Sequence, residues 1–368
     1  MSGAKQSPRI HGLSWQTAGE SHGPALLATL EGLPYGLKVD LGAIRDGLKR
    51  RWAGPGRGLR AGFEKDELSV LAGLKSGVTL GTPLVLSLNN SDTQIDVLPQ
   101  LSSPRPGHAD LPGVLRHKNR DVRAILERAS ARETAARTAL GEVARQLLQI
   151  FGVEVSSRVE SVADVPFSDS AACLERIAHA KEAGDSLGGI FSLTATGCPP
   201  GLGGYAQPAD RLDARLLGAV ATIPSVKGVE IGLGFAGAGV SGANYHDAII
   251  TAPDGWAGLS RETNRSGGIE GGLTNAQPIS LRAVCKPIPT LRHGVASVDL
   301  STGLASRATY ERSDVCVIEA AAVVGEAVLC LELASALIAR LGGLTLQECL
   351  ERFSFLGSTD AIADWPES

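Results

Sequence analysis

The stretch DVRAILERASARETAARTALGEVARQLLQIF, residues 121–151, carries the clearest secondary-structure pattern in the chain. Its apolar side chains recur at the helical period and form one stripe, and Gly152 follows as a stop signal. The stripe consists of Ala129, Ala136, Leu140, Val143, Leu147 and Phe151. We predict a long helix that packs this stripe on a core. Arg128 and Arg132 share a side at the edge of the stripe, so we expect Arg132 where core and cleft meet.

A second long helix is predicted over residues 317–341, where Gly342-Gly343 provides the end signal. Glu319, Glu326 and Glu332 interrupt its apolar sequence. Carboxylates at this density argue against a membrane span, so we expect a helix inside a soluble protein.

Shorter elements are predicted around these two helices. Residues 171–183 and 208–221 have helical patterns, whereas the broken apolar runs 26–37 and 66–89 predict strands and turns. Residues 228–272 are so rich in glycine that no helix is placed there. Strands interleaved with helices, without a Ser/Pro-rich linker, predict a mixed α/β or α+β protein with one domain over residues 1–368.

The chain has 368 residues, 43% of them apolar, and a formal charge of −4. This composition excludes disordered and fibrous proteins. Residues 1–17 lack the apolar segment of a secretory signal, which favours a cytoplasmic protein. The six cysteines are spaced too widely for a zinc or CxxC motif, and HExxH is absent. We therefore expect buried, reduced thiols and no metal.

Basic residues are concentrated in two stretches. Residues 49–60 contain five Lys or Arg and no acid, and residues 105–137 contain eight basic and four acidic residues. Guanidinium groups match phosphate and carboxylate, so the pattern favours an anionic small ligand. Nucleic acid is disfavoured, because neither a basic domain nor stacking aromatics accompany the arginines. Solvated surface faces are the simpler alternative.

Two short motifs suggest other classes of protein. GESHG at residues 19–23 formally fits the G-x-S-x-G elbow of serine hydrolases, which needs a strand before it and a helix after it. Pro24 follows at once and His22 lies inside the motif, which argues against a hydrolase. GLGFAG at residues 232–237 mimics a dinucleotide-binding loop, but the glycines that follow disfavour the required helix.

RPGHAD at residues 105–110 combines a rigid turn with an arginine, a histidine and an acid. Arg105 can hold an anion and His108 can exchange a proton near neutral pH; a structural histidine is the alternative. The loop TNRSGGIEGGLTN, residues 263–275, offers backbone amides to a phosphate or a flat ring, or is a flexible surface loop. Ser313 or Asp314 is expected to cap the helix that follows.

Together with further segments, these motifs make the chain similar to the chorismate synthase family. Eight motifs occur in the family's order: TAGESHG (17–23), RRWAGPGRG (50–58), RPGHAD (105–110), ERASARETAAR (127–137), VKGVEIGLGF (226–235), TNRSGGIEGGLTN (263–275), KPIPTL (286–291) and ERSDVC (311–316). So many collinear matches across most of the chain leave little room for chance.

The resemblance implies an α+β fold in which a helical layer is sandwiched between antiparallel β-sheets, and a homotetramer. It implies a carbon–oxygen lyase that acts on phosphates, with no nucleic-acid or membrane partner. The reaction is the 1,4-anti elimination of phosphate from 5-enolpyruvylshikimate 3-phosphate to give chorismate, in the shikimate pathway of aromatic amino-acid biosynthesis. Family members require reduced FMN, and some reduce it with NADPH. A substrate with one phosphate and two carboxylates suits the arginine-rich stretches.

The resemblance also implies residue roles. His22 lies near the leaving phosphate, His108 protonates or orients the reduced flavin near N1, and Asp314 acts at flavin N5 and relays the proton lost from the substrate ring. The positions implied for FMN are Arg128, Ala129, Ser130, Ser225, Val226, Gly271, Lys286, Pro287, Ile288, Pro289, Thr290 and Arg312. The positions implied for substrate or NADPH are Ser21, Arg51, Arg57, Arg60, Arg105 and Arg132.

Several positions depart from the family pattern. Arg116-His117 stands where many relatives have Lys-Tyr, Ala276 replaces a Gly, Pro289 replaces a Ser, and Glu319 replaces a Pro. None of these changes removes a proposed catalytic group, so we expect activity. The alternative from another class is a protein that binds reduced FMN and substrate without releasing phosphate.

Overall fold

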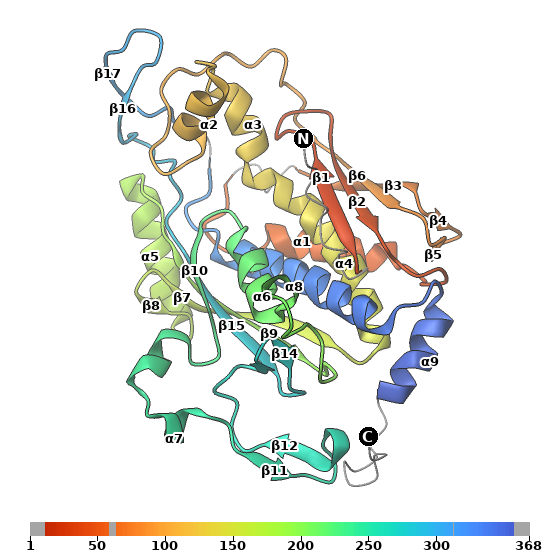
Figure 1. Cartoon of the computed structure of the whole chain (residues 1–368). Coiled ribbons are helices and arrows are strands. Elements are labelled where there is room, and N and C mark those ends of the chain that lie inside the picture. The colour runs from red at the N-terminus through yellow and green to blue at the C-terminus, as the bar shows by residue number, and fades with distance from the viewer. Residues whose placement is uncertain (1–11, 59–63, 312, 357–368) are drawn as a thin grey trace, which may run out of the picture.

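The computed structural model describes residues 12–58, 64–311 and 313–356, and its main body is two antiparallel sheets with helices between them (Figure 1). The first sheet has the order β1-β2-β6-β3, and the second has the order β10-β15-β9-β7-β8. The strands of the first sheet are β1 (Ser14–Ala18), β2 (Ala25–Glu31), β6 (Leu84–Asn89) and β3 (Glu67–Ala72). Those of the second are β10 (Val226–Ile231), β15 (Ile279–Cys285), β9 (Gly189–Thr196), β7 (Glu154–Val162) and β8 (Val165–Pro166).

Alternating burial along the strands fixes which sheet face meets the helices. In β2, Leu26, Ala28 and Leu30 are buried while the residues between them are partly or fully exposed. In β9 and β15, every second residue is likewise buried. Because side chains alternate across a strand, each sheet has one apolar face, and the two apolar faces sandwich the helical layer.

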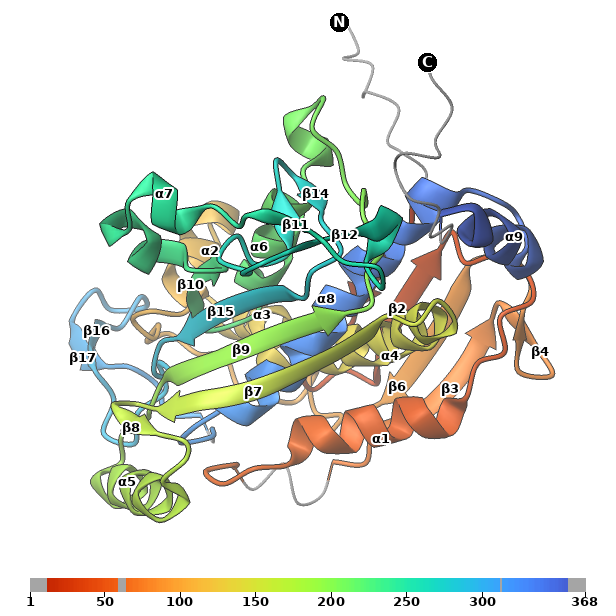
Figure 2. The ribbon, with the colours of Figure 1, turned by 90° about the horizontal axis from the view of Figure 1, so that it is seen from below.

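The helical layer consists of α1 (Leu41–Trp52), α4 (Thr134–Ile150) and α8 (Ile318–Leu341). Helix α4 packs on β2 and β6, α8 packs on β7 and β9, and the two helices pack on each other (Figure 2). They approach closely at Gly141, where a Cβ atom would lie 2.4 Å from Ala327. These contacts confirm the predicted α+β sandwich.

Helix α8 is the core helix of the molecule. By length and composition alone it could cross a membrane, but 89% of its most apolar segment is buried inside the protein. Two of its carboxylates are paired: Glu326 accepts hydrogen bonds from Arg50, Arg145 and Ser157, and Glu332 accepts two from Arg215. The helix predicted over residues 317–341 is therefore confirmed.

The helix predicted over residues 121–151 is interrupted at Ser130. It begins as α3 (Arg123–Ala129), and α4 follows only after a 3₁₀ turn, η2 (Ala131–Glu133). Ser130 is extended (ψ 142°), and its hydroxyl accepts the backbone N–H of Arg132. A serine that caps a following turn competes with the helix, so the prediction of one continuous helix was wrong here. Arg132 lies in η2 and is buried.

The remaining elements lie around the two sheets and the helical layer (Figure 1). The other helices are α2 (Asp110–His117), α5 (Ser170–Ala183), α6 (Leu212–Ala221), α7 (Gly242–Tyr245) and α9 (Leu346–Leu356). Two-stranded ribbons are formed by β4 (Leu74–Lys75) with β5 (Val78–Thr79), β11 (Ile249–Thr251) with β12 (Leu259–Arg261), β13 (Ile269–Glu270) with β14 (Leu273–Thr274), and β16 (Ala296–Val298) with β17 (Ala305–Arg307). The predicted helix over 171–183 is confirmed, whereas 208–221 divides into η3 (Pro208–Asp210) and α6.

All six cysteines are unpaired and buried, as predicted. Burial raises the pKa of the Cys198, Cys285 and Cys330 thiols to about 12. Because the thiolate is the reactive form, these cysteines serve as packing residues.

Candidate functional site

Three arginines that the sequence indicated as anion-binding residues lie around Trp52, the last residue of α1. The guanidinium carbons of Arg51, Arg57 and Arg132 lie 4.3, 5.6 and 5.9 Å from the ring centre of Trp52. Helix α1 supplies Arg51, the loop after it supplies Arg57, and η2 supplies Arg132. Cation–π contacts with one ring hold three positive charges together that would otherwise repel each other.

Asp66 and Asn90 fix two members of this cluster. Asp66 accepts a hydrogen bond from Trp52 Nε1 at 2.6 Å and pairs with Arg132 Nη1. Arg132 Nε donates to the side-chain oxygen of Asn90 at 2.8 Å. Arg51 Nη2 lies 4.0 Å from Asp66, which is too far for a hydrogen bond. Asp66 therefore neutralises only part of the positive charge.

Asp314 joins the cluster from the segment before α8. Its Oδ2 lies 2.9 Å from Arg57 Nη1, and its Oδ1 accepts the backbone N–H of Gly58 at 2.5 Å. The neighbouring Ser313 donates to the carbonyl oxygen of Thr290. Asp314 binds groups of the loop after α1 and the N-cap of α8 is Val317, so Asp314 belongs to the candidate site and is not the predicted helix cap.

The arginines keep unused hydrogen-bond donors inside the protein. Arg51 Nε and Nη2, Arg57 Nε and Arg132 Nη2 are buried and make no hydrogen bond to any described residue. Burial, helped by the charges of Arg132 and Arg57, lowers the pKa of Arg51 to about 10. Buried donors normally have acceptors, so this arrangement is suited to an anion with several oxygens.

The loop of residues 19–23 is held beside Arg132. The side-chain amide of Asn90 donates to the carbonyl oxygens of Glu20 and Gly23 at 3.1 and 2.7 Å. The same Asn90 accepts from Arg132, so one residue connects the loop to the arginine cluster. The predicted residues Ser21 and His22 are thereby brought next to the anion site.

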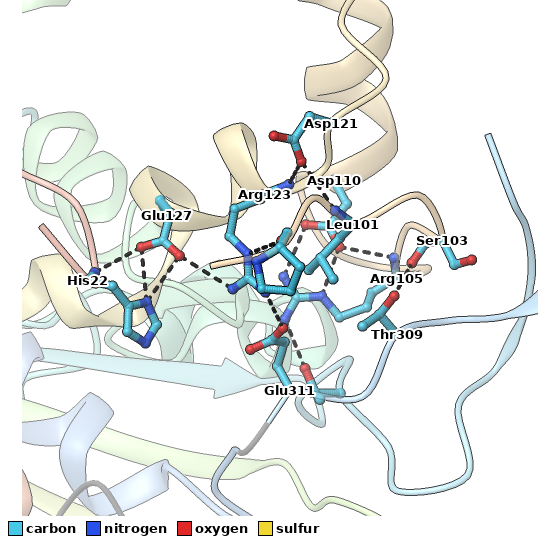
Figure 3. A network of polar contacts seen from close by, with 12 residues as sticks. His22, Leu101, Ser103, Arg105, Asp110, Asp121, Arg123, Glu127, Thr309 and Glu311 are labelled. Carbon is cyan, nitrogen blue, oxygen red and sulfur yellow. Dashed lines mark hydrogen bonds and ion pairs between the residues drawn. The ribbon is translucent and has the colours of Figure 1, made fainter. Parts of the chain in front are cut away.

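His22 has its ring against Glu127 of α3. Its Nδ1 lies 3.0 Å from both carboxylate oxygens of Glu127 (Figure 3). Its Nε2 lies 3.8 Å from Asp92. Burial alone would raise the pKa of Glu127, but hydrogen bonds and charge from His22, with Arg123, bring it below its usual value. Glu127 is thus a charged acceptor for Nδ1, which leaves Nε2 for a ligand.

His108 has the same kind of partner. Its Nδ1 lies 2.5 Å from Asp110, which also accepts hydrogen bonds from Arg105 Nε and Nη2 at 2.8 and 3.0 Å. A nitrogen this close to a carboxylate carries the proton, so Arg105 does not donate to it although Nη2 lies 3.0 Å away. Burial would raise the pKa of Asp110, but hydrogen bonds from His108 and Arg105 hold it well below its ordinary range.

The predicted flavin segment 286–290 runs beside the RPGHAD turn. Atoms of Pro289 and Lys286 lie 3.7 and 3.9 Å from the position of a Cβ atom on Gly107. The backbone N–H of Lys286 donates to the carbonyl of Ser225 at 2.8 Å. Burial and the charge of Lys227 lower the pKa of Lys286, which marks a positive patch with too little counter-charge.

Not all predicted site residues come together. Gly271 lies between β13 and β14, at the opposite end of β15 from Lys286. Arg128 donates to the carbonyl oxygens of Thr17 and Gly19, so it fastens β1 to α3. Ala129 and Ser130 lie at the break after α3. Arg60 and Arg312 lie outside the described residues.

Several residues of the site were not predicted: Trp52, Asp66, Asn90, Arg123 and Glu127. Trp52 and Glu127 stand inside quoted motifs, next to residues that were selected, and that adjacency was the available signal. Asp66 and Asn90 come from the start of β3 and the end of β6, in no motif. Only the pairing of these strands places them beside η2, so local sequence could not reveal them.

The serine hydrolase alternative lacks its structural context. The GESHG segment is followed by strand β2 rather than by a helix, and the ring of His22 faces Glu127. Ser21 is buried and donates its backbone N–H to the Glu127 carbonyl oxygen. Among the described residues, no three His, Cys, Asp or Glu side chains are grouped so that they could hold a metal ion.

A surface hollow is lined mainly by residues of α6 and by Glu332 of α8. It is lined by Trp15, Arg137, Arg215, Thr222 and Glu332, among others. Its arginines are engaged, because Arg215 pairs with Glu332 at 3.1 Å and Arg137 donates to Thr222 at 2.8 Å. Unused cationic donors therefore favour the Trp52 cluster as the anion site.

The chain is similar to known proteins over most of its length. Residues 13–338 match the model of the chorismate synthase family. The chain is 46% identical to chorismate synthase of Desulforudis audaxviator (strain MP104C), over 92% of this chain and 96% of that protein, and 43% identical to that of Geobacter sulfurreducens (strain ATCC 51573 / DSM 12127 / PCA), over 91% and 96%. A crystal structure of chorismate synthase superposes with a TM-score of 0.77 at 34% identity, covering 95% of this chain and 98% of that chain. The chain belongs to the chorismate synthase family, a family of carbon–oxygen lyases.

Proposed function

We propose that this protein catalyses the 1,4-anti elimination of phosphate from 5-enolpyruvylshikimate 3-phosphate, giving chorismate, with reduced FMN as cofactor. The observation that carries the proposal is the set of unused, buried guanidinium donors on Arg51, Arg57 and Arg132 beside Asp314. An enzyme that expels phosphate from a dicarboxylate needs both anion binding and a base, and the cluster offers both.

The substrate's phosphate and carboxylates are the proposed acceptors for these donors. Each arginine contacts Trp52, and Arg132 and Arg57 also pair with Asp66 and Asp314. Arg51 and Arg57 keep nitrogens without a hydrogen bond for the ligand, whereas the free Nη2 of Arg132 lies 3.6 Å from the Glu64 carboxylate. Arg105 differs, because its Nε, Nη1 and Nη2 donate to Asp110 and Thr290. We therefore assign Arg105 to holding His108, not to binding substrate directly.

Reduced FMN fits the segment 286–290. Lys286 and Lys227 form a positive patch suited to a cofactor that bears a phosphate. His108, with Nδ1 on Asp110, has Nε2 left for flavin N1. When bound, reduced FMN supplies the electron density that assists loss of phosphate from the substrate ring.

The chain's own groups manage the protons. As the carbon–oxygen bond breaks and phosphate leaves with the electron pair, His22 Nε2 donates its proton to a phosphate oxygen. Asp314 is the carboxylate that receives the proton lost from the ring, and a new carbon–carbon double bond completes the elimination. Its contacts with Arg57 and Gly58 hold the carboxylate in place.

The test is anaerobic release of phosphate from 5-enolpyruvylshikimate 3-phosphate, with chemically reduced FMN in one arm and oxidised FMN plus NADPH in the other. Release with reduced FMN supports the lyase, and release in the NADPH arm as well adds an intrinsic flavin reductase. Binding of both ligands without release in either arm would support the binding protein instead.

Assembly and location form a second part of the proposal. We propose a cytoplasmic homotetramer, in line with the family resemblance. Large apolar side chains that a single chain leaves exposed, including Tyr205, Phe235 and Phe355, support association. Light scattering gives the mass in solution, and a monomer at assay concentration would contradict the tetramer.

A further inference from the structure

We propose that Glu127 is a positioning residue that holds the proton of His22 on Nδ1, so that Nε2 is the nitrogen presented to the leaving phosphate. The inference rests on the proposed role of His22 in phosphate loss. It goes further by naming the residue that selects the reactive nitrogen, and it can be tested without substrate.

Glu127 forms hydrogen bonds with both the ring and the backbone of His22. Its Oε1 and Oε2 each lie 3.0 Å from Nδ1, and Oε2 also accepts the backbone N–H of His22 at 2.8 Å. The backbone N–H of Ser21 donates to the Glu127 carbonyl oxygen at 2.9 Å. The ring therefore has little freedom to turn its other nitrogen toward α3.

Glu127 is itself held in the charged form. It is 3% exposed, and Arg123 Nη1 lies 3.5 Å from its Oε1. Arg123 is fixed in turn, because its Nη2 donates to Glu311 at 3.0 Å and its Nε to the Pro99 carbonyl at 3.2 Å. Figure 3 shows Arg123 between Glu127 and Glu311. A charged carboxylate accepts and does not donate, so it requires a proton on Nδ1.

Among the described residues, the other ionisable group paired with the ring is Asp92. Its Oδ2 lies 3.8 Å from Nε2, beyond hydrogen-bond distance, so it does not compete for the ring proton. Asp92 lies in the segment after β6, whereas Glu127 belongs to α3. The two carboxylates thus flank the ring unequally, and the nearer one determines the tautomer.

This arrangement gives the proton transfer a defined start and end. A doubly protonated His22 donates from Nε2 to the phosphate oxygen as the carbon–oxygen bond breaks. The neutral ring that remains carries its proton on Nδ1, hydrogen-bonded to Glu127. The opposite tautomer would place a bare Nδ1 against the carboxylate and lose that bond.

The site repeats the arrangement at its second histidine. His108 Nδ1 meets Asp110, and Arg105 holds that carboxylate through two nitrogens. In both cases Nδ1 of the histidine contacts a carboxylate, and that carboxylate also pairs with an arginine. This repetition favours a role for the carboxylates in orienting the rings over a role confined to anchoring loops.

The test compares E127Q with a matched control, E133Q. Glutamine is uncharged and carries an NH2 donor in place of one carboxylate oxygen, so it no longer requires the proton of His22 to be on Nδ1. Glu133 also ties β1 to the helical segment, accepting from Thr17 at 2.6 Å and pairing with Arg137 at 2.9 Å, but it bonds no histidine. Its replacement controls for loss of a buried carboxylate.

The first readout is the ring ¹⁵N spectrum of His22 in histidine-labelled protein without ligands, recorded at a pH at which the ring is neutral and assigned by difference from H22Q. We expect the Nδ1–H tautomer in wild type and in E133Q, and a mixed or Nε2–H population in E127Q. Wild type with the proton on Nε2 overturns the proposal even if E127Q fails to fold. An unchanged tautomer in folded E127Q overturns it as well.

The second readout is turnover with reduced FMN. We expect kcat of E127Q to fall about 10- to 100-fold with KM little changed, the range found when a carboxylate that orients a metal-bound histidine is lost. E127D, which keeps the carboxylate, should recover the Nδ1–H tautomer and most of kcat. Failure of the lyase assay in wild type would reject the proposed function and leave the tautomer result standing.

Discussion

Arg57 Nη1 lies 2.9 Å from Asp314 Oδ2, so the loop after α1 and the segment before α8 meet in one ion pair. Both partners retain capacity for a ligand. Arg57 Nε is buried without a hydrogen bond to any described residue, and Asp314 is only partly buried. An ion pair with spare donors and an accessible carboxylate connects anion binding to proton acceptance.

Replacing Asp314 by asparagine should abolish most turnover without unfolding the protein. The amide still accepts from Gly58 but cannot take up a proton. Loss of a general base typically costs about 10²–10⁴-fold in rate. Anaerobic phosphate release measures the effect, and circular dichroism checks the fold. D164N is the control, because Asp164 is an exposed acid whose partner is Arg176 at 3.6 Å. A D314N rate near that of D164N would contradict the assigned role.

Arg51→Gln should remove anion binding while the free protein becomes no less stable. Burial lowers the pKa of Arg51 to about 10, so folding penalises its charged form. Both the folded and the ordinary value lie above pH 7, which means that the penalty is fully present there and is relieved only as pH rises through about 10.

Thermal unfolding with and without phosphate tests this prediction. Phosphate should raise the Tm of wild type, because a ligand that binds only the folded state stabilises it. The shift should vanish in R51Q and persist in R45Q, where Arg45 is an exposed residue of the same helix. Equal shifts in all three proteins would place the anion elsewhere.

The sequence predicted the elements whose bounds are set by nearby residues. Helix α8 begins and ends within one residue of its predicted bounds, because an apolar run and a Gly-Gly stop are both local signals. The same reasoning failed at Ser130, where one continuous helix was predicted. The helical period continues across this residue, but its hydroxyl caps η2 and interrupts the helix. Arg51 and Arg132 could be selected from motifs, but their partner Asp66 could not. Its place beside them depends on how β3 pairs with β6.

Glu326→Gln should destabilise the protein strongly. The Glu326 carboxylate is 2% exposed inside α8 and binds Arg50 at 2.8 Å, Arg145 at 2.6 Å and Ser157 at 2.6 Å. Breaking such a buried pair leaves uncompensated charge and costs about 3–5 kcal/mol. Denaturant unfolding at pH 7 measures this. E332Q on the same helix should cost at most about 1 kcal/mol, because its pair with Arg215 is partly exposed.

The same carboxylate should make stability depend on acid. Burial would raise the pKa of Glu326, but hydrogen bonds from Arg50 and Ser157 and the charge of Arg145 hold it below its ordinary value. Its stabilisation is therefore present above the ordinary glutamate pKa of about 4.3 and is lost as pH falls below it. Wild type should lose more unfolding free energy than E326Q between about pH 5 and pH 3. Parallel losses would show that Glu326 does not carry this dependence.

Ala276→Gly should stabilise the protein, although removing a methyl group from an ordinary position does the reverse. Ala276 has φ 70°, in the left-handed region that a Cβ atom disfavours, and it lies in the turn between β14 and β15. Relief of that strain is worth about 1–2 kcal/mol, and the added freedom of glycine in the unfolded chain offsets about 0.4–1 kcal/mol of it. We expect a net gain of about 0.5–1 kcal/mol in the unfolding free energy from denaturant titration. A214G is the control of opposite sign, because Ala214 is a helical residue of α6, where glycine costs about 1 kcal/mol. A loss of stability in both variants would mean that the turn at Ala276 stores no strain.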